Sequence, residues 1–254
     1  LEEVAGGTMS MNKFIVLGAS GGIGSETCRR LRADGSEVLL AGRSEERVSA
    51  LAAELDSPFR IIDATAIDQV EGCIEHGLET MGQVDGIVNC VGSVLLKPAH
   101  LTTSAEWHET IALNLTSAFA AVRGGHKAMR KAGGAIILMS TAAARIGLPN
   151  HEAIAAAKGG VIGLTQSAAA SYAARKIRVN AVAPGLVKTG LTERIWSNEK
   201  TAAASCAMHG LGRLGEPSDV ASLIVWLLPP ENDWVTGQVF GVDGGLATLR
   251  TSGR

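Results

Sequence analysis

The sequence predicts an α/β fold with a doubly wound parallel sheet of about seven strands and helices on both faces. Short apolar or β-branched runs alternate with longer helical patterns along the chain, which is typical of strand–helix–strand units. Several of these runs are apolar throughout, as expected for strands that are buried on both faces. A glycine-rich turn between the first run and the first helix is the third observation.

The expected strands are short runs separated by helical stretches. They are KFIVLG, EVLLAG, FRIID, VDGIVNC, GAIILMS, IRVNAVA and QVFGV, at residues 13–18, 37–42, 59–63, 84–90, 134–140, 177–183 and 238–242. Helices are expected near residues 23–34, 44–55, 67–80, 104–131, 152–174 and 217–228. The last of these has Pro217 in its first turn and Asp219 near its positive end, as helix starts favour.

The composition argues against several classes of function. The 254 residues carry 23 Lys and Arg against 25 Asp and Glu, a formal charge of −2, with neither sign concentrated. We therefore expect no nucleic-acid face, which needs clustered basic side chains, and no membrane span, because no apolar run is long enough. The cysteines, at positions 28, 73, 90 and 206, show no metal-site spacing, so we expect no metal and reduced thiols in a cytoplasmic protein.

The glycine-rich turn predicts a nucleotide site. FIVLGASGGIGSETCRRL places Gly18, Gly22 and Gly24 between the first strand and the first helix. Glycine lets the backbone approach a pyrophosphate, and free N–H groups at the helix start attract its charge, as in Rossmann-like domains. No linker divides residues 11–254, which we expect to form one such NAD(P)-binding domain. Residues 1–10 are expected to be an expression remnant or a disordered tail.

The end of the second strand indicates which nucleotide is bound. Gly42 stands where an acidic residue would bind the ribose 2′-hydroxyl of NAD, and Arg43 follows it. A guanidinium would instead pair with the 2′-phosphate of NADP(H), through charge-assisted hydrogen bonds of about 1.5–3 kcal/mol. The alternative is a solvated Arg43 that precedes a helix capped by Ser44.

Together with further motifs from about residue 12 to 248, this pattern resembles the short-chain dehydrogenase/reductase family. GASGGIG resembles its cofactor loop, NCVG (89–92) stands where the family usually has NNAG, and LNLTSAF carries Asn114 at the position of its active-site Asn. RVNAVAPGLVKTGL resembles the segment at the nicotinamide, and GRLGEPSDVASLIVWLL with VTGQVFGVDGG resembles the C-terminal signature. The resemblance implies an NAD(P)(H)-binding oxidoreductase, with NADP(H) preferred here, that forms a homotetramer or a dimer through two long helices and the last strand.

The resemblance also implies roles for single residues. Asn114 would hold a water or a helix irregularity in the proton path, or would only bond backbone. Lys158 would bind the nicotinamide ribose, and Thr141 takes the place of the family's Ser, while strand alternation points Ser140 away. Asp63 would meet the adenine. The implied cofactor-binding positions are Gly18, Ser20, Gly22, Ile23, Gly24, Arg43, Asp63, Ala64, Asn89, Gly92, Lys158, Pro184, Gly185, Val187 and Thr189.

The family's catalytic Tyr has no counterpart, because Ile154 stands four residues before Lys158. The chain's only Tyr, Tyr172, lies 18 positions further along the same helix. This is about 27 Å at the helical rise, so it cannot reach the same cofactor. Losing a general acid typically costs about 10²–10⁴ in rate, which slows an enzyme without necessarily abolishing it.

Three interpretations of this gap stay open. The first interpretation is an enzyme with a substitute acid. His151, three residues before Ile154, would supply the proton if the helix starts early enough; otherwise it faces solvent. Thr141 together with Lys158 could also relay a proton from water. In the second interpretation, the substrate depends less on a general acid, as an iminium or an activated alkene does. The third interpretation is a catalytically impaired NADP(H)-binding pseudoenzyme that acts as a sensor or partner subunit. Asn114 and Thr141 favour an enzyme that acts on a small carbonyl or alcohol with a non-standard proton donor.

Two further segments bear on the substrate. Residues 186–208 correspond to the family's mobile lid, and Trp196, Met208 and the small residues there suggest a moderately apolar substrate. The histidines His151 and His209 fall in expected loops, where they either border the mouth of the substrate site or are ordinary polar loop residues.

Overall fold

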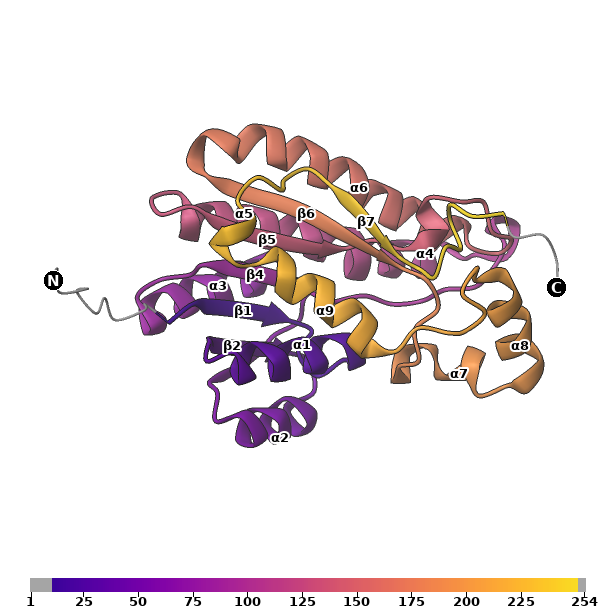
Figure 1. Ribbon diagram of the computed structural model, residues 1–254, viewed down its shortest axis with the longest axis horizontal. Coiled ribbons are helices and arrows are strands. Elements are labelled where there is room, and N and C mark those ends of the chain that lie inside the picture. The colour runs from indigo at the N-terminus through magenta and orange to yellow at the C-terminus, as the bar shows by residue number, and fades with distance from the viewer. Residues whose placement is uncertain (1–10, 251–254) are drawn as a thin grey trace, which may run out of the picture.

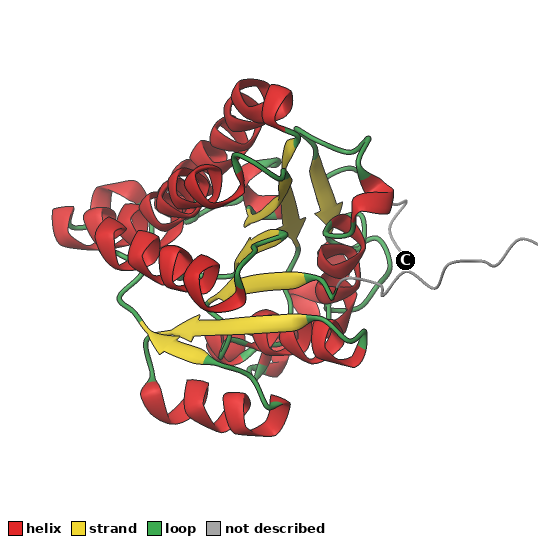
Figure 2. Ribbon diagram, turned by 90° about the vertical axis from the view of Figure 1, so that its left-hand side faces the viewer, coloured by secondary structure: helices red, strands yellow, loops and turns green. Residues whose placement is uncertain are grey.

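The computed structural model describes residues 11–250, so our expectation for residues 1–10 lies outside the described residues. Seven parallel strands form one sheet in the order β3-β2-β1-β4-β5-β6-β7, which confirms the doubly wound α/β fold (Figures 1 and 2). Each strand overlaps the run expected for it. The strands are β1 (Lys13–Leu17), β2 (Glu37–Gly42), β3 (Phe59–Ile61), β4 (Gly86–Asn89), β5 (Gly134–Met139), β6 (Ile177–Pro184) and β7 (Val239–Val242).

The helices cover both faces of the sheet (Figure 1). One face carries α1 (Gly22–Ala33), α2 (Glu45–Leu55) and α9 (Pro217–Leu227). The other face carries α3 (Ile67–Met81), α5 (Ser117–Met129) and α6 (Glu152–Tyr172), with α4 (Ser104–Ile111) packed on α6. Figure 1 also shows α7 (Glu193–Trp196) and α8 (Glu199–Met208) beyond the carboxyl end of β1.

Each face of the sheet has its own apolar core, because successive side chains of a strand point to opposite faces. In β1, Ile15 and Leu17 pack toward α3 and α5, whereas Phe14 and Val16 pack toward α1 and α9. All four side chains are buried. The two-sided burial explains why these runs are apolar throughout rather than alternating.

The strand order reverses between β1 and β4, since β1 leads to β2 and β3 on one side and β4 begins the other side. In open α/β sheets, ligands bind outside the carboxyl ends of the strands at such a reversal. The fold therefore predicts a ligand site among the residues that follow β1, β4, β5 and β6.

The structure differs from the expected helices at a few places. The single helix expected over residues 104–131 is interrupted by a π-helical segment, Ala112–Thr116, which separates α4 from α5. The helix expected over 152–174 ends at Tyr172 and continues as a 3₁₀ turn, Ala173–Arg175. Residues 186–208 contain α7 and α8, which the sequence pattern did not predict. Within the described residues no helix is both long and apolar enough to cross a membrane.

Candidate active site

The glycine-rich turn links β1 to α1 in a conformation that only glycine fits. Gly18 has φ +75°, and a Cβ on Gly24 would lie 2.3 Å from the Gly18 carbonyl oxygen. A Cβ on Gly22 would lie 2.7 Å from Cγ2 of Thr189 in the loop after β6. The N-cap residue, Gly21, has no side chain to cap the first N–H groups of α1. These N–H groups are suited to an anion, and the turn has the close backbone approach that a pyrophosphate requires.

The loops after β2 and β3 lie beside this turn. A Cβ on Gly42 would lie 3.4 Å from the Ser20 hydroxyl, so Arg43 follows the strand close to the turn. The Arg43 side chain is exposed and forms no ion pair with any residue in the range 11–250. Oδ1 of Asp63 accepts the Thr65 N–H at 2.9 Å and the Thr65 hydroxyl at 2.7 Å. These two bonds lower the pKa of Asp63, and the charge of Arg43 lowers it further.

The loop after β4 joins the glycine-rich turn to the centre of the site. Asn89 is buried, and its Oδ1 accepts the Val91 N–H at 3.1 Å, which fixes the direction in which the loop leaves the strand. A Cβ on Gly92 would lie 2.9 Å from Oδ1 of Asn114 and 3.4 Å from Nζ of Lys158. Glycine at 92 therefore keeps space open beside both polar side chains.

Asn114 lies in the π-helical segment, so the helix is irregular at this residue. Its Oδ1 accepts the Ser93 N–H at 3.1 Å, and its Nδ2 donates to the Ser93 hydroxyl and to the Thr110 carbonyl, both at 2.9 Å. The buried amide thus ties the helix to the loop after β4. Such π bulges are often found at functional sites.

Lys158 projects from α6 into the same region and is buried. Its Nζ donates to the Met139 carbonyl at 2.8 Å, at the end of β5. Burial lowers the pKa of Lys158 to about 8, and Cys90 opposes this shift. Burial also raises the pKa of the Cys90 thiol to about 12, which the charge of Lys158 counteracts in part. The site therefore holds a lysine that loses its charge at lower pH than an exposed lysine does.

Thr141 and Ser140 point in different directions at the end of β5, as strand alternation predicts. The Ser140 hydroxyl is buried and donates to the Lys158 carbonyl at 3.0 Å. The Thr141 hydroxyl accepts the Ala143 N–H at 3.3 Å and lies 3.5 Å from the Pro184 carbonyl, at the limit for a hydrogen bond. Thr141 consequently has a loosely held hydroxyl that can bond a ligand.

Two adjoining cavities meet at Thr141. The inner cavity, about 140 Å³, reaches toward the glycine-rich turn and is lined among others by Ile23, Gly92, Asn114, Lys158, Val187 and Thr189. The outer cavity, about 170 Å³, is lined in part by Ile195 of α7 and by Ser205 and Met208 of α8. Both cavities are lined by Thr141, Ile154, Pro184 and Gly185. The predicted positions Asn114, Thr141 and Lys158 thus gather around one hollow, whereas Arg43 and Asp63 lie outside it.

His151 and Ile154 both line the outer cavity. Helix α6 begins only at Glu152 and His151 is its N-cap residue, so the helix does not start early enough to give His151 a place on its face. The ring reaches the cavity from the loop instead, with Nδ1 2.7 Å from the Pro149 carbonyl. Because a carbonyl can only accept, Nδ1 carries the proton, and Nε2 has no partner among the described residues. Ile154 is 5% exposed.

His209 is buried in the wall of the outer cavity rather than in an exposed loop. Its Nδ1 lies 2.6 Å from the Ser205 carbonyl, and the Leu186 N–H donates to its Nε2 at 3.2 Å. Both ring nitrogens are used, so His209 positions the end of α8 and is not free to donate to a ligand. No sequence motif marks this role; the one local signal is Gly185, whose Cβ would lie 2.5 Å from Nε2.

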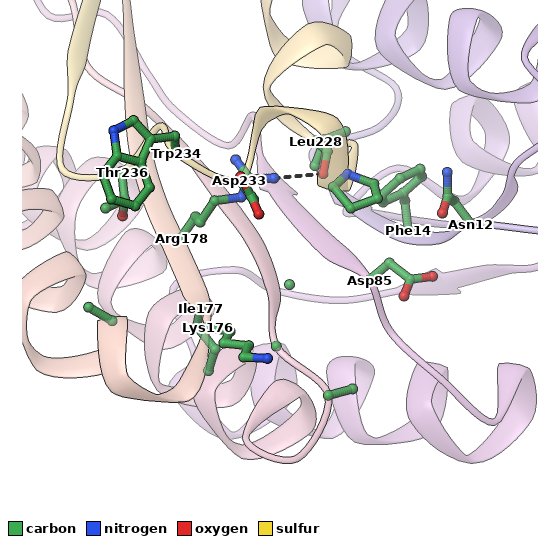
Figure 3. A pocket seen from close by; sticks show the side chains of 15 residues that line it. Asn12, Phe14, Asp85, Lys176, Ile177, Arg178, Leu228, Asp233, Trp234 and Thr236 are labelled. Atoms are coloured by element: carbon green, nitrogen blue, oxygen red, sulfur yellow. Dashed lines mark hydrogen bonds between the residues drawn. The ribbon is translucent and has the colours of Figure 1, made fainter.

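The largest hollow of the described residues lies elsewhere, beside the amino ends of the strands (Figure 3). Figure 3 shows Arg178 directed at the Leu228 carbonyl, a hydrogen bond of 2.9 Å, with Asp85, Lys176 and Trp234 around the opening. The Arg178 guanidinium also binds the Leu227 carbonyl at 2.7 Å, so it caps the end of α9. None of the predicted site residues lines this hollow, and we assign it no catalytic role.

Comparisons with known proteins agree with this geometry. A family profile described as enoyl-(acyl carrier protein) reductase matches residues 18–247. The chain is 34% identical over 241 residues to a 3-oxoacyl-(acyl-carrier-protein) reductase of Thermotoga maritima, covering 91% of this chain and 96% of that protein. A short-chain type dehydrogenase/reductase from Mycobacterium ulcerans superposes with a TM-score of 0.89 at 29% identity, covering 94% of this chain and 90% of that chain. A crystal structure of an actinorhodin polyketide ketoreductase with NADPH superposes with a TM-score of 0.88 at 28% identity, covering 94% and 98%.

The chain therefore belongs to the short-chain dehydrogenase/reductase family of oxidoreductases, which use a nicotinamide cofactor. The expectation of family and fold drawn from the motifs is confirmed.

Proposed function

We propose that the chain is an NADP(H)-dependent oxidoreductase that acts on a small carbonyl or alcohol substrate. The observation that carries this proposal is the inner cavity, which runs from beside the glycine-rich turn to Asn114, Lys158 and Thr141. NADP(H), when bound, supplies or accepts the hydride. The residues that would hold it are Gly18, Ser20, Gly22, Ile23, Gly24, Arg43, Asp63, Ala64, Asn89, Gly92, Lys158, Pro184, Gly185, Val187 and Thr189.

The preference for NADP(H) rests on Arg43. The guanidinium is exposed, has no ion-pair partner among the described residues, and follows a strand that ends in Gly42 rather than in an acidic residue. Pairing with a 2′-phosphate through bonds of about 1.5–3 kcal/mol would give roughly one to two decades of preference over NAD(H). The ketoreductase with NADPH supports this choice by analogy.

The proton would come from a group other than a Tyr. Thr141 would hold the substrate oxygen with its loosely bonded hydroxyl, and Lys158 would orient the cofactor ribose. Ile154, at the position of the family's Tyr, has no proton to give. His151 lines the same cavity, and its Nε2 has no partner among the described residues, which makes it the candidate donor in the imidazolium form, where both ring nitrogens carry a proton.

A second candidate is a pseudoenzyme that binds NADP(H) as a sensor or partner subunit. The apolar Ile154 favours it, since an apolar side chain is expected there once no acid is required. The hydroxyl of Thr141 and the buried amide of Asn114 favour the enzyme, because nucleotide binding alone requires neither.

Quenching of tryptophan emission by NADPH and by NADH tests the cofactor. We expect NADPH to bind about 10- to 100-fold more tightly than NADH, and Arg43→Ala to remove most of the difference. Arg47→Ala, an exposed arginine in the next helix, is the matched control and should leave both affinities unchanged. Failure of both nucleotides to bind at millimolar concentration would reject the enzyme and the sensor alike.

The His151→Ala variant tests the proton donor. We expect turnover to fall by about 10- to 100-fold, because the substrate oxygen loses its proposed proton donor. His100→Ala, an exposed histidine outside both cavities, is the control. Unchanged turnover of His151→Ala across the pH range would remove His151 from the mechanism.

We further propose that residues 11–254 form one domain of a cytoplasmic homotetramer or dimer. Free cysteines without disulfides among the described residues support a reducing compartment. Exposed aromatic side chains on the helices, including Trp107, Phe119 and Trp226, support contacts between copies.

A further inference from the structure

The outer cavity has an unusual lining for a site that would accept polar metabolites. Apolar side chains from several segments form most of its wall, and none of the Asp, Glu, Lys and Arg residues in the range 11–250 lines it. The apolar members are Val94, Leu96, Ala142, Ala143, Leu148, Ile154, Leu186, Ile195, Met208 and Leu246. Loops, α7, α8 and the segment after β7 all contribute, so the apolar character belongs to the whole wall and not to one helix.

The polar groups of the cavity are hydroxyls and imidazoles. Thr141, Thr192 and Ser205 contribute hydroxyls, and His151 contributes a ring nitrogen. His209 presents no charge to a ligand, since the Leu186 N–H occupies the lone pair of its Nε2. Lys158 lines the inner cavity and not the outer one, and it is bonded to a backbone carbonyl. A carboxylate or phosphate there would leave water, and its one ionisable partner among the described residues would be the His151 ring, whose proton the proposed mechanism gives to the substrate oxygen.

The size of the cavity bounds the part of the substrate that it encloses. Its volume is about 170 Å³. A protein cavity of roughly 150 Å³ with apolar walls is large enough for benzene. The enclosed part should therefore contain about six to eight carbon atoms, with any further groups outside the mouth.

We infer that the substrate is an uncharged ketone or secondary alcohol whose enclosed body is apolar and about the size of one six-membered ring. The reacting oxygen lies at Thr141, and the ring or branched chain fills the space between Ile154, Leu186 and Met208. Anionic groups such as carboxylates and phosphates are excluded from the cavity. This inference rests on the proposed function, because it concerns the substrate of that same site.

Three cyclohexanones of similar size test it: 4-methylcyclohexanone, 4-oxocyclohexanecarboxamide and 4-oxocyclohexanecarboxylate. Binding is measured by saturation-transfer NMR and calorimetry, with and without NADPH, and turnover by the alcohol formed. We expect 4-methylcyclohexanone to bind about 100-fold more tightly than the carboxylate, with the amide between them. Equal binding of the carboxylate, or no binding of 4-methylcyclohexanone to the NADPH-loaded protein, would overturn the inference.

A positive charge placed in the cavity should reduce this difference. Met208 lines the cavity and is 49% exposed, so Met208→Lys can be accommodated without a buried charge. We expect it to bind the carboxylate at least about 10-fold more tightly than the unaltered protein does. Leu101→Lys, at a side chain 56% exposed outside the cavity, is the control and should change nothing.

The experiment distinguishes a wrong cofactor assignment from a wrong substrate class. Loss of NADPH quenching in the unaltered protein would reject the cofactor assignment, while the comparison without NADPH still reports the charge preference of the cavity. If NADPH binds and Met208→Lys leaves carboxylate affinity unchanged, the ligand does not occupy the outer cavity, and the inferred substrate class is wrong.

Discussion

At the scale of single residues, Ile154 offers the sharpest test of the proposal that the site has no tyrosine acid. Its side chain lies in the wall shared by the two cavities, so a phenol introduced there has space to reach a substrate oxygen at Thr141. We expect Ile154→Tyr to raise the rate of carbonyl reduction by about 10- to 100-fold, because His151, as the proposed donor, already supplies part of the roughly 10²–10⁴ that a general acid usually contributes. Ile154→Phe adds the same ring without the hydroxyl and should give no gain. Equal rates for the two variants, measured with 4-methylcyclohexanone, would show that protonation does not limit turnover.

Lys158 makes the stability of the protein depend on pH in a defined direction. Its pKa is lowered from 10.5 to about 8 by burial, so between these values the unfolded chain binds more protons than the folded one. Unfolding free energy therefore rises with pH in this window, by up to about 3 kcal/mol.

Urea unfolding of the unaltered protein and Lys158→Met, from pH 7 to 9.5, isolates this effect. The unaltered protein should gain stability relative to the variant as the pH passes 8. Lys200→Met, at an exposed lysine in α8, should show no such trend. A constant difference between the unaltered protein and Lys158→Met would mean that the buried amine does not titrate in this range.

At the scale of helices, Gly24 in α1 and Gly72 in α3 differ in whether an added side chain would fit. A Cβ on Gly24 would meet the backbone of Gly18, whereas a Cβ on Gly72 in α3 would meet nothing within 4 Å. We expect Gly24→Ala to destabilise the fold by about 1–3 kcal/mol and to weaken NADPH binding at least about 10-fold. Gly72→Ala should instead stabilise the protein by roughly 0.5–1 kcal/mol and leave binding unchanged. Thermal unfolding and tryptophan quenching measure both; a tolerated Gly24→Ala would contradict a tight turn.

The helices and strands also show which parts of the structure could be predicted from the sequence. Short apolar or β-branched runs located all seven expected strands, including β3, whose residues are exposed, and the glycine spacing located the turn before α1. The π segment at Asn114 was not predicted as an element, because its residues continue a helical pattern and the irregularity depends on bonds to Ser93, distant in sequence. Helix α8 was missed because it is rich in small residues without a helical apolar period.

The position of the site was predictable, but its chemistry depends on tertiary contacts. The family motifs located Asn114, Thr141 and Lys158, which the structure brings around one hollow. The burial of His209 depends on contacts with Leu186 and Ser205, and no local pattern records them. The apolar wall of the outer cavity likewise combines segments that no single motif joins.

At the scale of the whole molecule, exposed apolar groups bear on assembly. Strand β7 is at one edge of the sheet, and Phe119 on α5 is 43% exposed. Unpaired edge strands and exposed aromatic side chains favour association with another chain, because both gain from being covered. We expect light scattering after size-exclusion chromatography to give the mass of a dimer or a tetramer.

A charge at Phe119 on α5 should weaken the assembly. Phe119→Glu should produce a smaller species at micromolar concentration, since an aromatic side chain buried at an interface contributes strongly to the free energy of association. Phe59→Glu is the matched control, because Phe59 is 40% exposed on β3, at the opposite edge of the sheet. A monomeric unaltered protein would reject the proposed assembly. A smaller species for Phe59→Glu with none for Phe119→Glu would place the contact at the β3 edge and remove α5 from it.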